Sequence, residues 1–142
     1  MYRTLAQKII RENKYLTLGT TNGVRPWVAP VYYCLDKKGS MYFISQPRSR
    51  HIRDLKSHPH VAFAIFDSHA EEGKGNGVQG SGHVIELLSS ALTQGLRHYC
   101  TSFVALSSEE LTHGPYRLYR LQPEKMYVLD RRSKVDKRIL VT

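Results

Sequence analysis

MYFISQPRSRHIRDLKSHPHVAFAIF, residues 41–66, joins two apolar runs through a polar corner and a short amphipathic segment. The first run indicates a strand over residues 40–46, and the last run, residues 61–66, indicates a buried strand. Between them, residues 51–57 suit a short helix, which the following His-Pro pair ends because proline cannot continue a helix. The stretch therefore predicts a strand, a sharp corner, a helix and a second strand.

The corner itself, PRSRH at residues 47–51, gathers hydrogen-bond donors. Unpaired backbone N–H groups at the start of a helix favour an anion. Ser49 adds a hydroxyl, Arg50 adds a fork of donors that fits phosphate oxygens, and His51 adds a donor whose charge depends on its surroundings. Ser45, at the strand end, supplies a second hydroxyl. We predict a phosphate site here; the alternative is that Ser49 is only the helix N-cap and the arginines are solvated.

The rest of the chain is mainly strand-like. Asn22-Gly23 between two such runs predicts a hairpin, and Gly80 and Gly82 mark a bulge or a close backbone approach. The other expected elements are helices over residues 2–13 and 88–100, strands over 15–20, 24–35, 78–86, 116–121 and 125–129, the last two on either side of Pro123, and a mobile loop over 68–77. Many antiparallel strands with few helices favour a closed barrel that the helix over 51–57 plugs or caps.

Composition limits the function classes. With 142 residues, the chain is expected to form one domain, residues 1–142, with a basic tail from Arg131. Its net charge of +9 implies an anionic partner: nucleic acid, an anionic membrane or a phosphorylated small molecule. Cys34 and Cys100 lack CxxC spacing and are interpreted as reduced core residues. No stretch resembles a signal peptide or could span a bilayer, so we expect a cytoplasmic protein without a membrane partner.

Three segments resemble the FMN-binding split-barrel superfamily of pyridoxamine 5′-phosphate oxidase. They are RPWVAPVYYCLDKKGSMYFIS (25–45), SRHIRDLKSHPHVAFAIFD (49–67) and GVQGSGHVIEL (77–87). Their order and spacing imply a mainly β protein with short helices, an FMN-binding split β-barrel. Residues 116–142 lack the pattern with which the family's oxidases hold their pyridoxal substrate. The resemblance therefore implies a flavin-dependent oxidoreductase of unknown substrate, similar to the oxidase but not the oxidase proper.

The resemblance also implies a cofactor site for FMN. The matching positions are Ser49, Arg50 and His51 for the phosphate corner, Ile44 and Ser45 for the strand end beside it, and Val28, Ala29, Pro30 and Val31 for a backbone ledge along the flavin ring. His51 stands where the family usually has lysine, so FMN binding would be weaker or pH-dependent. Trp27 could stack on the flavin or lie in the core or a subunit contact. The family implies a homodimer with FMN at the subunit interface.

Two other functions stay open. The first is a non-catalytic carrier or sensor of flavin or haem, with His69 or His113 as an iron ligand. The second, less favoured, is a nucleic-acid-binding barrel whose basic tail contacts phosphates, with Tyr116, Tyr119 and Tyr127 as stacking platforms. A deazaflavin would need the same anion pocket and ring ledge as FMN. The histidine spacings match no metal motif, so no bound metal is expected, and no side chain stands out as a general acid or base.

Overall fold

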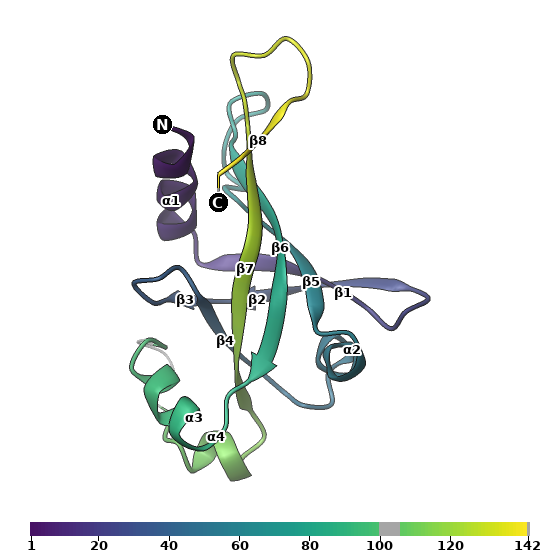
Figure 1. The fold of residues 1–142 in the computed structure, drawn as a ribbon, viewed down its shortest axis with the longest axis vertical. Coiled ribbons are helices and arrows are strands. Elements are labelled where there is room, and N and C mark those ends of the chain that lie inside the picture. Colours follow the sequence, from purple (N-terminus) through teal and green to yellow (C-terminus); the bar gives the residue numbers. More distant parts are fainter. Residues whose placement is uncertain (100–105, 142) are drawn as a thin grey trace.

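The computed structural model describes residues 1–99 and 106–141, and these residues form an antiparallel sheet with short helices (Figure 1). The elements are α1 (Tyr2–Glu12), β1 (Tyr15–Thr21), β2 (Pro26–Tyr32), β3 (Cys34–Leu35), β4 (Met41–Ser45), α2 (Arg50–Ser57), β5 (His60–Phe66), β6 (Gly77–Glu86), α3 (Ser89–Leu96), α4 (Glu110–His113), β7 (Arg117–Leu129) and β8 (Arg138–Leu140). The predicted strand, corner, helix and strand over residues 41–66 are thus confirmed.

The sheet curls round on itself. Neighbouring strands follow the order β2-β1-β5-β6-β7-β4-β3, and all of the pairings are antiparallel. β2 and β3 stand at the two ends of this order, yet only Tyr33 separates them in the chain. Residues 26–35 therefore pair with β1 through their first part and with β4 through their second part. The predicted fold class, a mainly β split barrel with short helices, is confirmed.

The barrel interior is built by strands that turn every second side chain inward. In β1, Leu16 and Leu18 are fully buried, whereas Tyr15 points outward. The same interior cluster receives Ile52 and Leu55 from α2, so this helix caps the barrel. Burying a side chain of this size contributes about 1.5–3 kcal/mol, which is enough to hold a two-turn helix that would not be stable alone. The corner before α2 is therefore fixed by core packing.

A second apolar cluster lies outside the barrel wall. Tyr42 and Leu118, on β4 and β7, pack there against Leu87, Leu92 and Leu111. Figure 1 shows α3 and α4 together at the lower end of β4 and β7. These helices cover a part of the sheet that would otherwise expose apolar side chains.

Pro123 lies inside one long strand. The sequence predicted separate strands over 116–121 and 125–129, which is wrong, because β7 runs through the proline without a break. The register between β6 and β7 shifts between Ser81 and Gly82, and Gly82 pairs with Pro123. A bulge accommodates a residue that cannot donate a backbone hydrogen bond. The extra residue, Glu124, belongs to β7 and lies opposite the Ser81–Gly82 step of β6, so the prediction that a glycine of β6 marks a bulge is confirmed.

Three further predictions need correction. The strand expected over 24–35 is interrupted at Tyr33, whose hydroxyl donates to the Ile10 carbonyl at 2.5 Å. The helix expected over 88–100 ends at Leu96, and residue 100 lies outside the described residues. Cys34 is half-buried and does not belong to the buried core; the same prediction for Cys100 falls outside the described residues.

The segment after Leu129 returns to the sheet. β8 pairs with β7, and Val141 is buried in the barrel cluster. The Asp130 N–H donates to the Lys137 carbonyl at 2.8 Å, which closes the turn between the two strands. The basic residues predicted as a tail from Arg131 therefore form a turn and a strand, and they are not a free solvated extension. Within the described ranges, no helix combines the length and the apolar character needed to cross a membrane.

Candidate functional site: the corner between β4 and α2

Ser49 occupies the N-cap position of α2, as predicted, with an extended backbone (φ −61°, ψ 151°). Its hydroxyl does not cap the helix but donates to the Gln46 carbonyl at 2.8 Å, and its N–H donates to the same oxygen at 3.0 Å. Pro47 and Arg48 therefore lie in a tight turn. Among the described residues, no side chain caps the first turn of α2, so its N–H groups remain available to an anion.

His51 brings the two predicted serines together. Its Nε2 lies 2.9 Å from the Ser45 hydroxyl and 3.3 Å from the Ser49 hydroxyl. Burial lowers the pKa of His51 because it disfavours the charged form, and the negative charge of Asp54 offsets this only in part. The imidazole is therefore neutral at pH 7. Its Nε2 either donates to or accepts from the Ser45 hydroxyl, whereas the Ser49 hydroxyl, which donates to the Gln46 carbonyl, can only accept from it. The expectation that a histidine here reduces the fixed charge of the corner agrees with this shift.

Arg50 connects the corner to β2. Its guanidinium carbon lies 4.2 Å from the centre of the Trp27 ring, in a cation–π contact. Trp27 is 42% exposed, so it does not belong to the core, and it lies next to the corner. The contact places the arginine predicted for phosphate next to the strand predicted for the flavin ring.

The side chains of the four residues predicted for the ledge on β2 point in alternating directions. Ala29 and Val31 point into the barrel, whereas Val28 and Pro30 point outward. β2 stands at the end of the strand order, so its edge away from β1 has no partner strand among the described residues. This explains why β2 tolerates Pro30. Only the backbone and the outward side chains are therefore accessible on this face, and Ala29 and Val31 present no more than their main-chain groups to it.

Ile44 contributes less directly than the other predicted residues. Its side chain is half-buried and packs against the outer cluster beneath α3 and α4. The next residue along β4, Ser45, is buried and holds His51. Ile44 therefore positions the strand end through packing, and its side chain does not reach the corner donors.

A buried hydrogen bond that the sequence did not reveal anchors α2. The Thr20 hydroxyl donates to the Asp54 carboxylate at 3.0 Å, and both residues are buried. Asp54 lies between the buried Ile52 and Leu55 on the core-facing side of the helix. An acidic residue on an otherwise apolar helix face could have indicated this buried hydrogen bond, because a buried carboxylate needs a partner. Hydrogen bonds to charged groups contribute about 1.5–3 kcal/mol, so this pair helps to fix the corner against β1.

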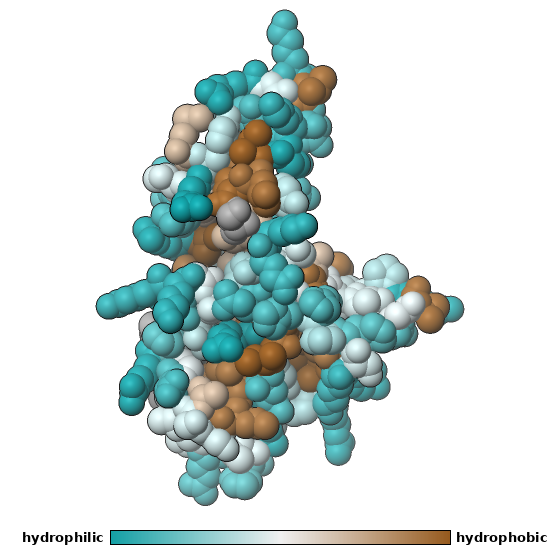
Figure 2. Space-filling view, in the orientation of Figure 1, coloured by the Kyte–Doolittle hydropathy of each residue, from teal (hydrophilic) through white to brown (hydrophobic). Residues whose placement is uncertain are grey.

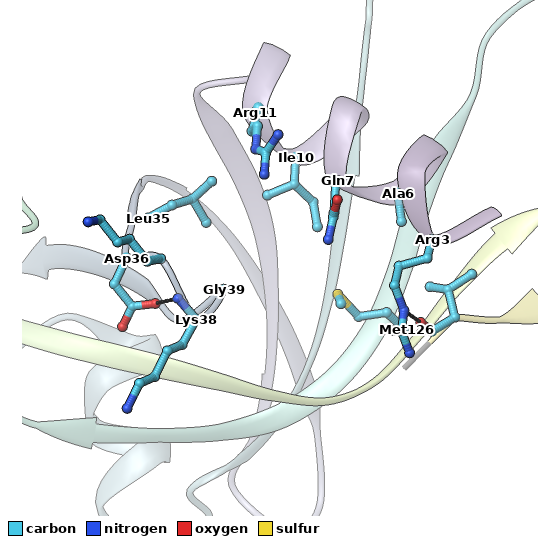
Figure 3. Close-up of a pocket in the computed structure, with 12 residues that line it drawn as sticks. Arg3, Ala6, Gln7, Ile10, Arg11, Leu35, Asp36, Lys38, Gly39 and Met126 are labelled. Carbon is cyan, nitrogen blue, oxygen red and sulfur yellow. Dashed lines mark hydrogen bonds between the residues drawn. The ribbon is translucent and has the colours of Figure 1, made fainter. Parts of the chain in front are cut away.

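One cavity lies beside the corner, and another lies away from it, next to α1. A cavity of about 490 Å³ beside the turn is bordered by Arg48 and Arg117, which adds positive charge next to the donors. A separate cavity of about 340 Å³ lies between α1 and the turn after β3, with Arg3 and Arg11 on its α1 side (Figure 3). Figure 2 shows apolar surface between α1 and the β7–β8 region, flanked by hydrophilic side chains. This second cavity shares no residue with the corner.

The residues considered for other functions do not gather at the corner. The side chain of His69 is 95% exposed in the loop after β5, and His113 ends α4 at the surface. Tyr119 is buried and stacked on Phe43, so it cannot serve as a platform for bases, and that part of the nucleic-acid prediction is wrong. Tyr116 is partly exposed.

The curled antiparallel sheet, with a short helix at its corner, defines a split-barrel protein. The chain belongs to the pyridoxamine 5′-phosphate oxidase family, which it matches over residues 4–130. No curated protein matches the chain.

Solved structures show the same fold at low sequence identity. A heme binding protein from Mycobacterium smegmatis has a TM-score of 0.78 and 16% identity; the match covers 99% of this chain but only 58% of that one. The heme storage protein HutZ from Vibrio cholerae has a TM-score of 0.64 and 20% identity, with 88% and 92% coverage. An FAD-binding protein from Mesorhizobium loti has a TM-score of 0.66 and 20% identity, with 87% and 88% coverage.

Proposed function

We propose that this protein binds FMN at the corner between β4 and α2 and acts as a flavin-dependent oxidoreductase. The observation that carries the proposal is the hydrogen-bonded set of Ser45, His51 and Ser49, with Arg50 beside it at the uncapped start of α2. Membership of the pyridoxamine 5′-phosphate oxidase family supports it, as does the similar fold of the Mesorhizobium FAD-binding protein.

The residues present fit a phosphate monoester joined to a flat ring. Arg50 can donate two parallel hydrogen bonds, the Ser45 hydroxyl can donate one, and the helix start adds backbone N–H groups, whereas the Ser49 hydroxyl would have to turn away from the Gln46 carbonyl to donate a further one. The open edge of β2 offers N–H and C=O groups to the polar rim of a ring, and Trp27 offers an aromatic face. FMN would supply the redox chemistry when bound, while the chain would bind and orient it.

We also propose that the protein is a homodimer. The outer face of β1, β2 and β5 exposes large apolar side chains: Tyr15 is 61% exposed, Val28 64% and Phe66 54%. The strand register places Gly19 between Val28 and Ala62, which leaves the middle of this face flat enough for a second copy to approach. An exposed apolar face of this kind is unusual on a monomer and is typical of a subunit interface.

A retained flavin spectrum is the first test of cofactor binding. The protein would be mixed with FMN, desalted, and examined by visible absorption. Trp27 is the only tryptophan, so its fluorescence reports directly on the corner. We expect a retained flavin spectrum and saturable quenching of Trp27. No retained flavin and no quenching would contradict the proposal.

A haem or flavin carrier is the second candidate function, favoured by the fold shared with the Mycobacterium heme binding protein and with HutZ. A Soret band after incubation with haemin, without flavin retention, would support the haem carrier. Cycling of bound flavin by a reduced nicotinamide would support the enzyme, and bound flavin that never cycles would support a flavin carrier.

FMN affinity should depend on pH through His51. Because burial holds the pKa of His51 below its usual value, the free protein carries a neutral imidazole at pH 7.5. Lowering the pH protonates it and adds a positive charge that faces the phosphate. We expect the ratio of Kd values, His51→Gln over wild type, to rise about 3- to 10-fold between pH 7.5 and 5.5. The ratio cancels the phosphate's own titration, and a constant ratio would show that His51 does not face the ligand.

Dimerisation can be tested on the exposed sheet face. Val28→Arg should shift the cofactor-free protein toward the monomer in sedimentation velocity, because an arginine would be buried without a partner. Val135→Arg is the matched control, since Val135 is 72% exposed in the turn before β8. Equal sedimentation of both variants and the wild type as dimers would place the interface elsewhere.

A further inference from the structure

A third cavity, also of about 490 Å³, lies between α3, the turn after β3, and β7. It shares no residue with the corner or with β2. Its walls come from segments far apart in the sequence, including Tyr42 of β4, Gln94 of α3, His98 just after that helix, and Arg120 of β7. A volume between about 300 and 1,000 Å³ is typical of cavities that bind small molecules.

Arg120 dominates the charge of this cavity. Its Nε is buried and makes no hydrogen bond with the described residues. Burial, and then the hydrogen bond to Asp36, raise the pKa of the Tyr42 hydroxyl, and a hydrogen bond with the Arg120 guanidinium and its positive charge partly offset that effect. A buried donor without a partner is rare in folded proteins and calls for an explanation, such as a bound group that is not part of the chain.

Asp36, the acidic residue that lines the cavity, is engaged elsewhere. Its carboxylate accepts hydrogen bonds from the Tyr42 hydroxyl at 3.0 Å, the Lys38 N–H at 2.8 Å and the Ser40 N–H at 3.0 Å. Figure 3 shows the contact with Lys38. With these acceptor positions filled, Asp36 stabilises the turn and does not pair with Arg120.

The other polar groups of the cavity are mainly donors. The Oε1 atom of Gln122 accepts from the Ser40 hydroxyl at 2.8 Å, which leaves its NH₂ group for another acceptor. The His98 ring lies against the Tyr42 ring with centroids 5.3 Å apart. Lys37 and Lys38 stand on the exposed rim. The lining therefore carries three fixed positive charges against one negative charge.

We propose that this cavity is a second binding site, distinct from the flavin site, for a small organic anion. Its carboxylate or phosphate group would pair with the Arg120 guanidinium, and Gln122 and the rim lysines would supply further donors. Leu87 and Ala91 would contact the remainder of the molecule.

The test is an NMR titration of the full chain, with inorganic phosphate in one series and acetate in another. Changes in amide chemical shift distinguish the two sites. Gly95 and Gln122 report on this cavity, and Ser49 and His51 report on the corner. We expect saturable shifts at Gly95 and Gln122 with at least one of the two ions. Arg120→Gln should weaken this binding at least fivefold. Arg97→Gln, an exposed arginine next to the cavity wall, should change it less than twofold.

Ala91→Phe provides an independent variant that keeps every charge, because it places a ring in the cavity from the exposed side of α3. We expect it to abolish the shifts at Gly95 and Gln122 while leaving those at the corner. If Arg120→Gln does not fold, the Ala91→Phe variant alone tests whether the ion binds in this cavity. Absence of saturable shifts with both ions, or equal weakening by Arg120→Gln and Arg97→Gln, would overturn the proposal without affecting the flavin site.

Discussion

Replacing Arg50 with alanine is expected to weaken FMN binding by about 10- to 100-fold. Charge-assisted hydrogen bonds contribute about 1.5–3 kcal/mol each, and 1.4 kcal/mol corresponds to a tenfold change in Kd. Arg50 contacts Trp27 on β2 and begins α2 beside Ser49, so its loss removes both the fork of donors and the link to the ring ledge. Titration calorimetry is the suitable measurement, because the substitution also changes the surroundings of Trp27.

Arg131→Ala is the matched control for this experiment. Arg131 donates to the carbonyls of Gly73 and Lys74 at 2.6 and 2.8 Å, away from the corner, and its loss lowers the net charge by the same amount. We expect less than a twofold change in Kd. If both substitutions weakened FMN binding equally, the corner would act only through the net charge of the protein, and the phosphate site would have to lie elsewhere.

Gly82→Ala is expected to destabilise the protein by about 3 kcal/mol, which corresponds to a fall in Tm of about 10 °C for a chain of this length. A Cβ at this position would lie 2.2 Å from the Gln122 carbonyl oxygen and 3.0 Å from its carbon. Both are backbone atoms of β7, and they cannot move without breaking the bulge that admits Pro123. Thermal unfolding followed by circular dichroism measures the effect.

Gly75→Ala is the control for Gly82→Ala. A Cβ at Gly75 would meet only the Ala70 Cβ, at 3.4 Å, which is an ordinary contact. We expect a change in Tm of no more than about 2 °C, because an unstrained glycine-to-alanine change has a small effect. Similar unfolding temperatures for the two variants would mean that β6 and β7 do not approach each other as the bulge requires.

Much of the corner could be predicted because its signals are local. Ser45, Ser49, Arg50 and His51 lie within seven consecutive positions, and the end of a strand followed by the start of a helix places such residues together. The direction of the Ser49 hydroxyl was less predictable. It donates to Gln46, whereas an N-cap serine usually accepts from the helix, because the turn at Pro47 brings that carbonyl within reach.

The ledge on β2 could be predicted only as a strand. Alternation indicates that neighbouring side chains face opposite sides, but it does not show which set faces the core. The pairing of β2 with β1 decided that Ala29 and Val31 point inward. The contact between Trp27 and Arg50 also depends on this pairing, since the two residues are far apart in the chain.

By itself, the sequence determined the turns, the strand and helix periods, the cluster of donors at residues 45–51 and the family of the fold. These features depend on backbone preferences and on neighbours within a few residues. Only the tertiary structure decided that β7 continues through Pro123, that residues 138–141 return to the sheet, and that Asp54 is held by Thr20. It also brought Arg120 together with α3. The physical reason is that strand register and the burial of polar groups depend on the whole packed core, to which residues distant in the sequence contribute.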